Sequence, residues 1–99
     1  NNFSHLEFRT DLGGLWENFC IVERLKQNQY KGNFVQSYFW RNYFGEEIDY
    51  LEVKNNIYSA YECKWNEKAK VKQPKDFLAN YSNATFKVIH QNNFSDFLL

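Results

Sequence analysis

The chain contains no methionine among its 99 residues, and it opens on Asn1-Asn2-Phe3. A natural reading frame starts with methionine, so we expect this chain to be part of a longer protein. No apolar run approaches the roughly 20 residues that a membrane-spanning helix needs, and no basic-then-apolar leader opens the sequence. We therefore predict a cytoplasmic location and no membrane partner.

Cysteine and net charge are also scarce. Cys20 and Cys63 are the two cysteines, and no metal-ligand spacing connects them, so we expect two buried, reduced thiols. Twelve Lys and Arg balance twelve Asp and Glu, so the chain as a whole has no general attraction for nucleic acid. Any such binding would depend on a local basic patch.

Aromatic residues, by contrast, make up 20% of the chain. This composition is typical of a folded globular chain whose core is built from rings. Ninety-nine residues are enough for one small hydrophobic core and leave little for a second. We predict a single domain over residues 1–99.

Hydrophobic spacing predicts a helix early in the chain, after an entry segment at residues 1–10. Asp11 can cap this helix, which extends to Gln29. Its apolar side chains recur at three- and four-residue steps and form an amphipathic stripe: Leu12, Leu15, Trp16, Phe19 and Val22. We expect that stripe to pack on the core.

The predicted strands are runs of aromatic and β-branched residues without helical spacing: Phe34–Trp40, Glu47–Lys54, Ile57–Trp65 and Thr85–His90. A lysine-rich connection and a helix at residues 74–81, with Phe77, Leu78 and Tyr81 buried, separate the last two strands. An apolar tail at residues 94–99 should pack on the core. The order of helix, three strands, helix and strand predicts an α/β fold.

Asn55-Asn56 between two of these strands predicts a tight hairpin turn. Such a turn would place Asp49 directly opposite Glu62, with the Cβ atoms ~4.5–5.5 Å apart. Two carboxylates so close need a compensating cation or a solvated face. Lys64 projects from the same face as Glu62, because side chains two residues apart on a strand share a face.

Two carboxylates and an amine on one face suit metal-dependent cleavage of a phosphodiester. Mg²⁺ prefers oxygen ligands and keeps several waters, so Asp49 and Glu62 would be enough protein to hold it. Lys64 would orient the attacking water or stabilise the developing negative charge. The alternative is a solvated strand end, where an ion pair between Lys64 and a neighbouring acid contributes only ~0–1 kcal/mol.

Other candidates surround this face. Glu52 belongs to a second Glu-x-Lys triplet, but it lies three residues from Asp49 and points to the opposite side, so we expect it to have no role in the site. Trp40 and Arg41 could contact a nucleic-acid strand, or Trp40 could be a core residue. A basic run follows the site and is either a nucleic-acid contact or a solvated connection: Lys64, Lys68, Lys70, Lys72 and Lys75.

Ile48-Asp49, followed by Glu62-Cys63-Lys64 on the adjoining strand, resembles the motif of the PD-(D/E)xK nuclease superfamily, whose core order is αβββαβ around a mixed central sheet. A closer likeness, over nearly the whole chain, is to the C-terminal domain of uncharacterised function that follows a P-loop ATPase module in many bacterial and archaeal ATPases. That likeness rests on four segments in order: Leu15-Trp16-Glu17-Asn18-Phe19, Tyr38-Phe39-Trp40-Arg41, Glu47-Ile48-Asp49 and Tyr61-Glu62-Cys63-Lys64-Trp65.

The resemblance implies a restriction-endonuclease-like fold in which Asp49 and Glu62 bind Mg²⁺, Lys64 is the catalytic lysine and Glu17 is an additional acid from the first helix. Glu17 lies away from the apolar stripe, so it would reach the site only if the helix packed by a second edge. The sequence has no Gly-rich loop ending in Gly-Lys-Ser/Thr, so ATP would bind only in a preceding ATPase module.

Three functions remain open on this basis. The first is Mg²⁺-dependent cleavage of DNA or RNA. The second is a catalytically inactive nuclease fold that binds a partner protein or nucleic acid and regulates its own ATPase module. The third is a structural role, in which the aromatic tail docks the domain on its ATPase or on a second copy.

Overall fold

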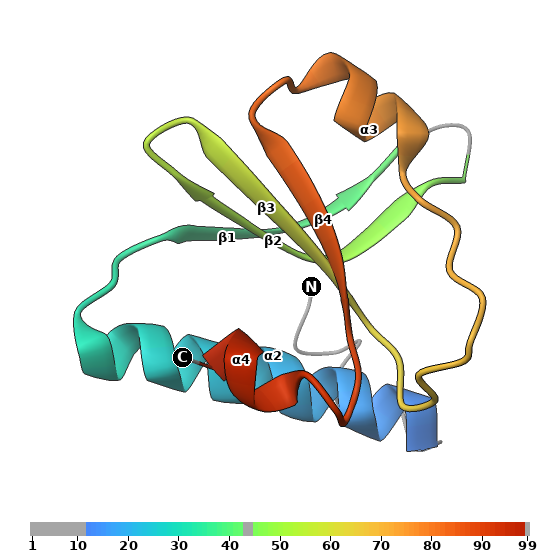
Figure 1. Ribbon diagram of the computed structural model, residues 1–99. Helices are drawn as coiled ribbons and strands as arrows, with labels where there is room; N and C mark the ends of the chain where they lie inside the picture. Colours follow the sequence, from blue (N-terminus) through green and yellow to red (C-terminus); the bar gives the residue numbers. More distant parts are fainter. Residues whose placement is uncertain (1–11, 43–44, 99) are drawn as a thin grey trace.

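The computed structural model describes residues 12–42 and 45–98, and the predicted entry segment, its capping residue Asp11 and part of the turn at 42–45 lie outside these ranges. It contains a four-stranded sheet with helices on both faces (Figure 1). The elements are α2 (Leu12–Lys31), β1 (Gln36–Arg41), β2 (Glu47–Lys54), β3 (Ile57–Cys63), α3 (Lys75–Asn80), β4 (Ala84–Ile89) and α4 (Phe94–Leu98). The predicted α/β fold is confirmed.

The sheet is mixed, with the strand order β1-β2-β3-β4. The first three strands pair antiparallel, and β3 pairs with β4 in parallel. Parallel neighbours need a crossover connection, which here passes through α3. Helices α2 and α4 lie together on one side of the sheet and α3 lies on the other (Figure 1).

The turn between β2 and β3 has the predicted form. Asn55 and Asn56 have φ values of 53° and 64°, and asparagine tolerates this left-handed region better than most residues. Two consecutive positive φ values are typical of a type I′ hairpin turn. The register expected from that turn is observed as far as the pair Tyr50–Tyr61.

Strand β2 contains a bulge at the end far from this turn. Tyr38 pairs with Leu51 and Trp40 pairs with Ile48, so β1 advances two residues where β2 advances three. The extra residue lies within Asp49–Tyr50, and a bulge of this kind turns side chains away from strict alternation. Ile48 accordingly belongs to the same core cluster as Leu51, whereas strict alternation would place it on the face of Tyr50.

The core has two parts, one on each face of the sheet. The α2 and α4 side buries Trp16, Cys20, Tyr50, Cys63, Ile89 and Phe97. The α3 side buries Ile48, Leu51, Ala60 and Phe77. Trp40 packs edge-on against Phe77 at 5.1 Å between ring centroids, so its environment is the core. Tyr81, expected to be buried, is 37% exposed, although its ring packs against those of Phe77 and Tyr58.

Helix α2 does not pack through the predicted apolar stripe. Its buried residues are Gly14, Trp16, Glu17, Cys20 and Asn28. The stripe residues other than Trp16 are exposed to solvent. The sheet-facing side of the helix is partly polar, and its polar groups find partners in the sheet. The Arg24 guanidinium, for example, donates to both carboxylate oxygens of Glu52, at 2.8 and 2.9 Å.

Glu52 is the centre of a buried polar network between α2 and β2. It is 5% exposed, and its Oε2 also accepts from the Asn28 amide and the Tyr50 hydroxyl, each at 2.8 Å. Burial acts to raise the pKa of Glu52, but the hydrogen bonds from Arg24 and Tyr50 outweigh it and hold that pKa below its ordinary value. Glu52 therefore has a structural role that the sequence did not indicate, because it fixes α2 to the sheet.

Candidate active site

The four predicted site residues come from elements that meet at the end of the sheet away from the hairpin turn. Glu17 lies on α2, Asp49 on β2 and Glu62 on β3, and Lys64 directly follows β3. The Oδ2 atom of Asp49 accepts a hydrogen bond from the backbone N–H of Cys63 at 3.4 Å, which places the aspartate beside the Glu62–Lys64 segment.

Glu17 faces the sheet rather than solvent. It is 6% exposed, and its carboxylate is close enough to Asp49 to raise the pKa of that residue. This placement follows from the way α2 packs, since the helix turns its second edge to the sheet and its apolar stripe outward. The structure therefore brings an acid of α2 to the two acids of the hairpin.

Asp49 is the most perturbed acid of this group. Burial raises its pKa, and the carboxylates of Glu17 and Glu62 raise it further, from 3.8 to about 7. The N–H of Cys63 and the ammonium of Lys64 act in the opposite direction without compensating. Burial and the two neighbouring carboxylates therefore both favour the protonated form of Asp49.

Glu62 and Lys64 form an ion pair, with 3.3 Å between Nζ and Oε1. The backbone N–H of Lys64 donates to the carbonyl of Ile89 at 2.8 Å, which holds the lysine at the end of the sheet. Beside Glu62 lies a cavity of about 180 Å³, whose other lining residues are Gly45, Glu46, Glu47, Lys72 and Pro74. Of the predicted basic run, Lys72 lines this cavity.

Glu46 is a buried residue of this region that no sequence pattern indicated. It is 8% exposed, and its Oε2 accepts from the backbone N–H of Asp76 at 3.2 Å. It thereby satisfies a donor in the first turn of α3. The two residues are 30 positions apart, so local spacing carries no signal for this contact.

Carboxylate oxygens suit a hard cation such as Mg²⁺, and the carboxylates of Glu17 and Glu62 near Asp49 would favour a positive charge here. The positions of the side chains fit a metal site less well than their chemical type does. Among residues 12–42 and 45–98, no three His, Cys, Asp or Glu side chains are grouped closely enough to share one metal ion. A cation would therefore be held by two carboxylates with water molecules completing its shell.

The two cysteines lie beneath this site. Both are buried and form no disulfide, as predicted. A hydrogen bond with Cys20, followed by burial, raises the pKa of Cys63, and the nearby charges of Asp49 and Glu17 add to the effect. The Cys63 thiol therefore stays protonated at neutral pH and is not a nucleophile.

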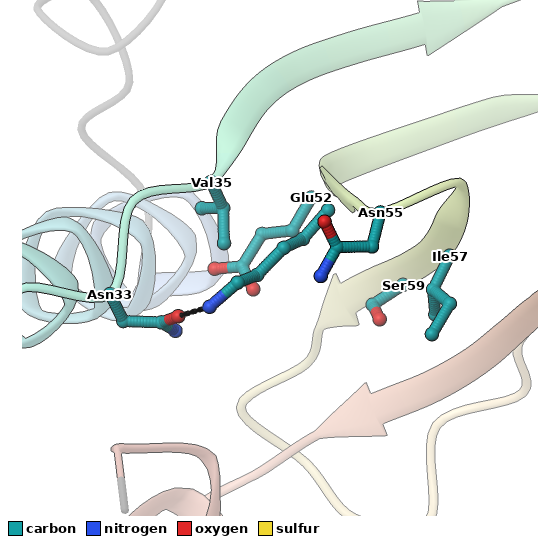
Figure 2. A pocket seen from close by; sticks show the side chains of 7 residues that line it. Asn33, Val35, Glu52, Asn55, Ile57 and Ser59 are labelled. Atoms are coloured by element: carbon teal, nitrogen blue, oxygen red, sulfur yellow. Dashed lines mark hydrogen bonds between the residues drawn. The ribbon is translucent and has the colours of Figure 1, made fainter.

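A second cavity, of about 240 Å³, lies at the other end of the sheet beside the hairpin turn (Figure 2). Asn33, Val35, Glu52, Lys54, Asn55, Ile57 and Ser59 line it. Two of its polar groups pair with each other, since Lys54 donates to Asn33, and a third, Glu52, is held by Arg24 of α2. The acidic cluster is the stronger candidate site.

The similarity of this chain to known proteins lies at the level of a domain family. Searches of curated proteins and of solved structures find no match. In the described part of the chain, no helix combines the length and apolarity needed to cross a membrane. Residues 12–96 match the model of a family described as a domain of unknown function, DUF4143. Because this match extends from the start of α2 into α4 and includes all four candidate residues, the chain belongs to the DUF4143 family.

Proposed function

We propose that this DUF4143 domain is a Mg²⁺-dependent phosphodiesterase of the PD-(D/E)xK type that cleaves DNA or RNA and is joined to a P-loop ATPase module in the full-length protein. The observation that carries the proposal is the meeting of Glu17, Asp49, Glu62 and Lys64 at one end of the sheet. The order of elements and the motif spacing support it, because both resemble those of this nuclease superfamily.

Each of the four residues has its own role in the proposed reaction. Asp49 and Glu62 would hold the Mg²⁺ ion, and the bound ion would activate a water and offset phosphate charge. Lys64 stabilises the negative charge that develops on the phosphate. Glu62 keeps the Lys64 ammonium at the site through their 3.3 Å ion pair. Glu17 contributes a further negative charge from the helix side.

One observation favours a second candidate, a nuclease fold without catalysis. The described residues contain no group of three side chains placed for a metal. A domain of that kind would bind a partner protein or nucleic acid and regulate the ATPase module. The two candidates differ in whether carboxylate-dependent Mg²⁺ binding occurs.

Plasmid DNA and a single-stranded RNA, each incubated with Mg²⁺ or Mn²⁺, test the proposal. Asp49→Asn and Lys64→Met should each lower the cleavage rate at least ~100-fold, because a metal ligand or a charge-stabilising group is lost. Glu23→Gln on the outer part of α2 and Lys87→Met on β4 are the matched controls and should cleave like the unaltered chain.

Equal cleavage by all five proteins would identify a contaminating nuclease and refute the assignment. Calorimetric titration with Mg²⁺ provides the second readout. Heat that disappears in Asp49→Asn supports the metal site. Absence of both cleavage and carboxylate-dependent heat supports the non-catalytic module instead.

A further inference from the structure

Within residues 12–42 and 45–98, the apolar side of α2 is exposed to solvent. Leu12, Leu15, Phe19, Val22 and Leu25 are 56%, 52%, 48%, 38% and 41% exposed, respectively. Steps of three and four residues place them along one side of the helix, which we call the outer stripe. The opposite side of the same helix packs on the sheet. A contiguous apolar strip of this kind marks an interaction site in soluble proteins.

The apolar area of the outer stripe is close to the apolar area that one partner buries in a homodimer interface. Its five side chains present on the order of 400 Å² of apolar surface, within the range of functional patches. A standard interface buries ~800 Å² per partner, of which ~65% is apolar in homodimers. The stripe would supply most of that apolar area. The rings of Phe19 and Phe94, 5.2 Å apart, extend the apolar surface onto α4.

We propose that the outer stripe is a homodimer interface in which the α2 helices of two copies pack antiparallel about a two-fold axis beside Phe19. Leu15 of one copy then faces Val22 of the other, and Leu12 faces Leu25, so apolar side chains meet along the whole stripe. An isologous contact of this kind needs one self-complementary patch and closes on itself. No unrelated partner is required to cover the helix.

Charge selects the antiparallel direction. Lys26 lies one turn beyond Val22 on the same side of the helix, and its side chain is 68% exposed, although its ammonium also pairs with Glu23 at 3.2 Å. Parallel packing would bring the two Lys26 ammonium groups together, and like charges at such positions are destabilising. Antiparallel packing places them at opposite ends of the interface, and it also opposes the two helix dipoles.

This contact leaves the candidate active site open. Glu17 faces the sheet, on the other side of α2 from the outer stripe. The dimer is therefore independent of the proposed nuclease activity, and either can fail without the other.

Sedimentation of the unaltered chain and of two variants, from low-micromolar to submillimolar concentration, tests the proposal. The unaltered chain should dimerise. Leu15→Glu should raise the dimer Kd at least about 100-fold, because two-fold symmetry introduces the charge twice. Ile57→Glu is the matched control, since Ile57 is equally exposed, at 54%, but lies on β3 beside the hairpin turn. It should dimerise like the unaltered chain.

A chain that stays monomeric at the highest concentration overturns the proposal, and so does equal weakening by both variants. Circular dichroism confirms that both variants are folded, which their exposed positions favour. Disulfide trapping then tests the direction. A mixture of Leu15→Cys and Val22→Cys should cross-link at least about tenfold faster than either variant alone, because residues 15 of the two copies are ~10 Å apart along the helix axis. Faster cross-linking of the single variants would overturn the antiparallel arrangement.

Discussion

Replacing Asp49 with Asn should stabilise the domain above neutral pH. Burial and the carboxylates of Glu17 and Glu62 raise the pKa of Asp49 to about 7 in the folded chain, against 3.8 when unperturbed. The folded state therefore holds this proton more tightly than the unfolded state. Below about pH 4 the Asp49 carboxyl is neutral in both the folded and the unfolded state and does not affect stability. As the pH rises from about 4 to about 7, the carboxyl ionises more readily in the unfolded state, so it lowers the free energy of unfolding progressively. Asparagine removes that opposition and can still accept the N–H of Cys63.

The size of the effect follows from the same values. A pKa difference of about 3, at about 1.4 kcal/mol per pKa unit, corresponds to about 4 kcal/mol above pH 7. Asp49 is not fully enclosed, and water reduces the electrostatic opposition. We therefore expect Asp49→Asn to raise the free energy of unfolding by ~2–4 kcal/mol at pH 8, or roughly 10–20 °C in Tm for a domain of this size.

Urea unfolding at pH 4 and pH 8, at one fixed protein concentration, measures this difference. Glu23→Gln is the control because Glu23 pairs with Lys26 at the surface, and it should change stability by less than ~1 kcal/mol at either pH. Mg²⁺ should stabilise the unaltered chain at pH 8 but not Asp49→Asn, since only a charged carboxylate at position 49 attracts the cation. If the unaltered chain and Asp49→Asn are equally stable at pH 8, the clustering of acids around Asp49 is refuted.

Two further predictions concern the fold. Glu52→Gln should lower the free energy of unfolding by ~3–5 kcal/mol at pH 7, because it leaves the Arg24 guanidinium buried without a counter-charge. The pKa of Glu52 is lowered by folding, so this loss should shrink as the pH falls from about 4.5 through that pKa, and a pH-independent loss in urea titrations would contradict the ion-pair explanation. Asn55→Ala should cost ~1–2 kcal/mol in thermal unfolding, because alanine is strained at positive φ, whereas Asn55→Gly should be near neutral. Equal losses in both variants would argue against strain at the turn.

The elements were predictable where several local signals coincide. Asn55-Asn56 marks the turn, and most residues around it are β-branched or aromatic, so the hairpin and its register as far as Tyr50–Tyr61 follow from the sequence. The short helix α4 was expected only as an apolar tail, because five residues are too few to show a helical period. The parallel pairing of β3 with β4 could be anticipated from element order and resemblance, since no local pattern encodes strand direction.

The buried side of α2 could not be predicted from spacing. The apolar stripe is genuine, but periodicity reports only that a helix has an apolar side, and says nothing of which side meets the sheet. Arg24 and Asn28 on the other side look like solvent-facing residues until Glu52 is placed beside them. These contacts join residues more than twenty positions apart, so the local sequence pattern does not indicate them.

The candidate site depends on a similar non-local feature. Strict alternation along β2 puts Asp49 on the face of Leu51, away from α2, whereas the bulge at Asp49–Tyr50 lets Asp49 interact with Glu17 as well as Glu62. No glycine marks this bulge, so the sequence did not indicate it. Repulsion among the carboxylates of Glu17, Asp49 and Glu62 opposes folding. The Arg24–Glu52 ion pair, two turns along α2 from Glu17, offsets this repulsion by holding the helix on the sheet. Residue spacing could suggest the acids, but only the packing of α2 explains how three of them are kept together.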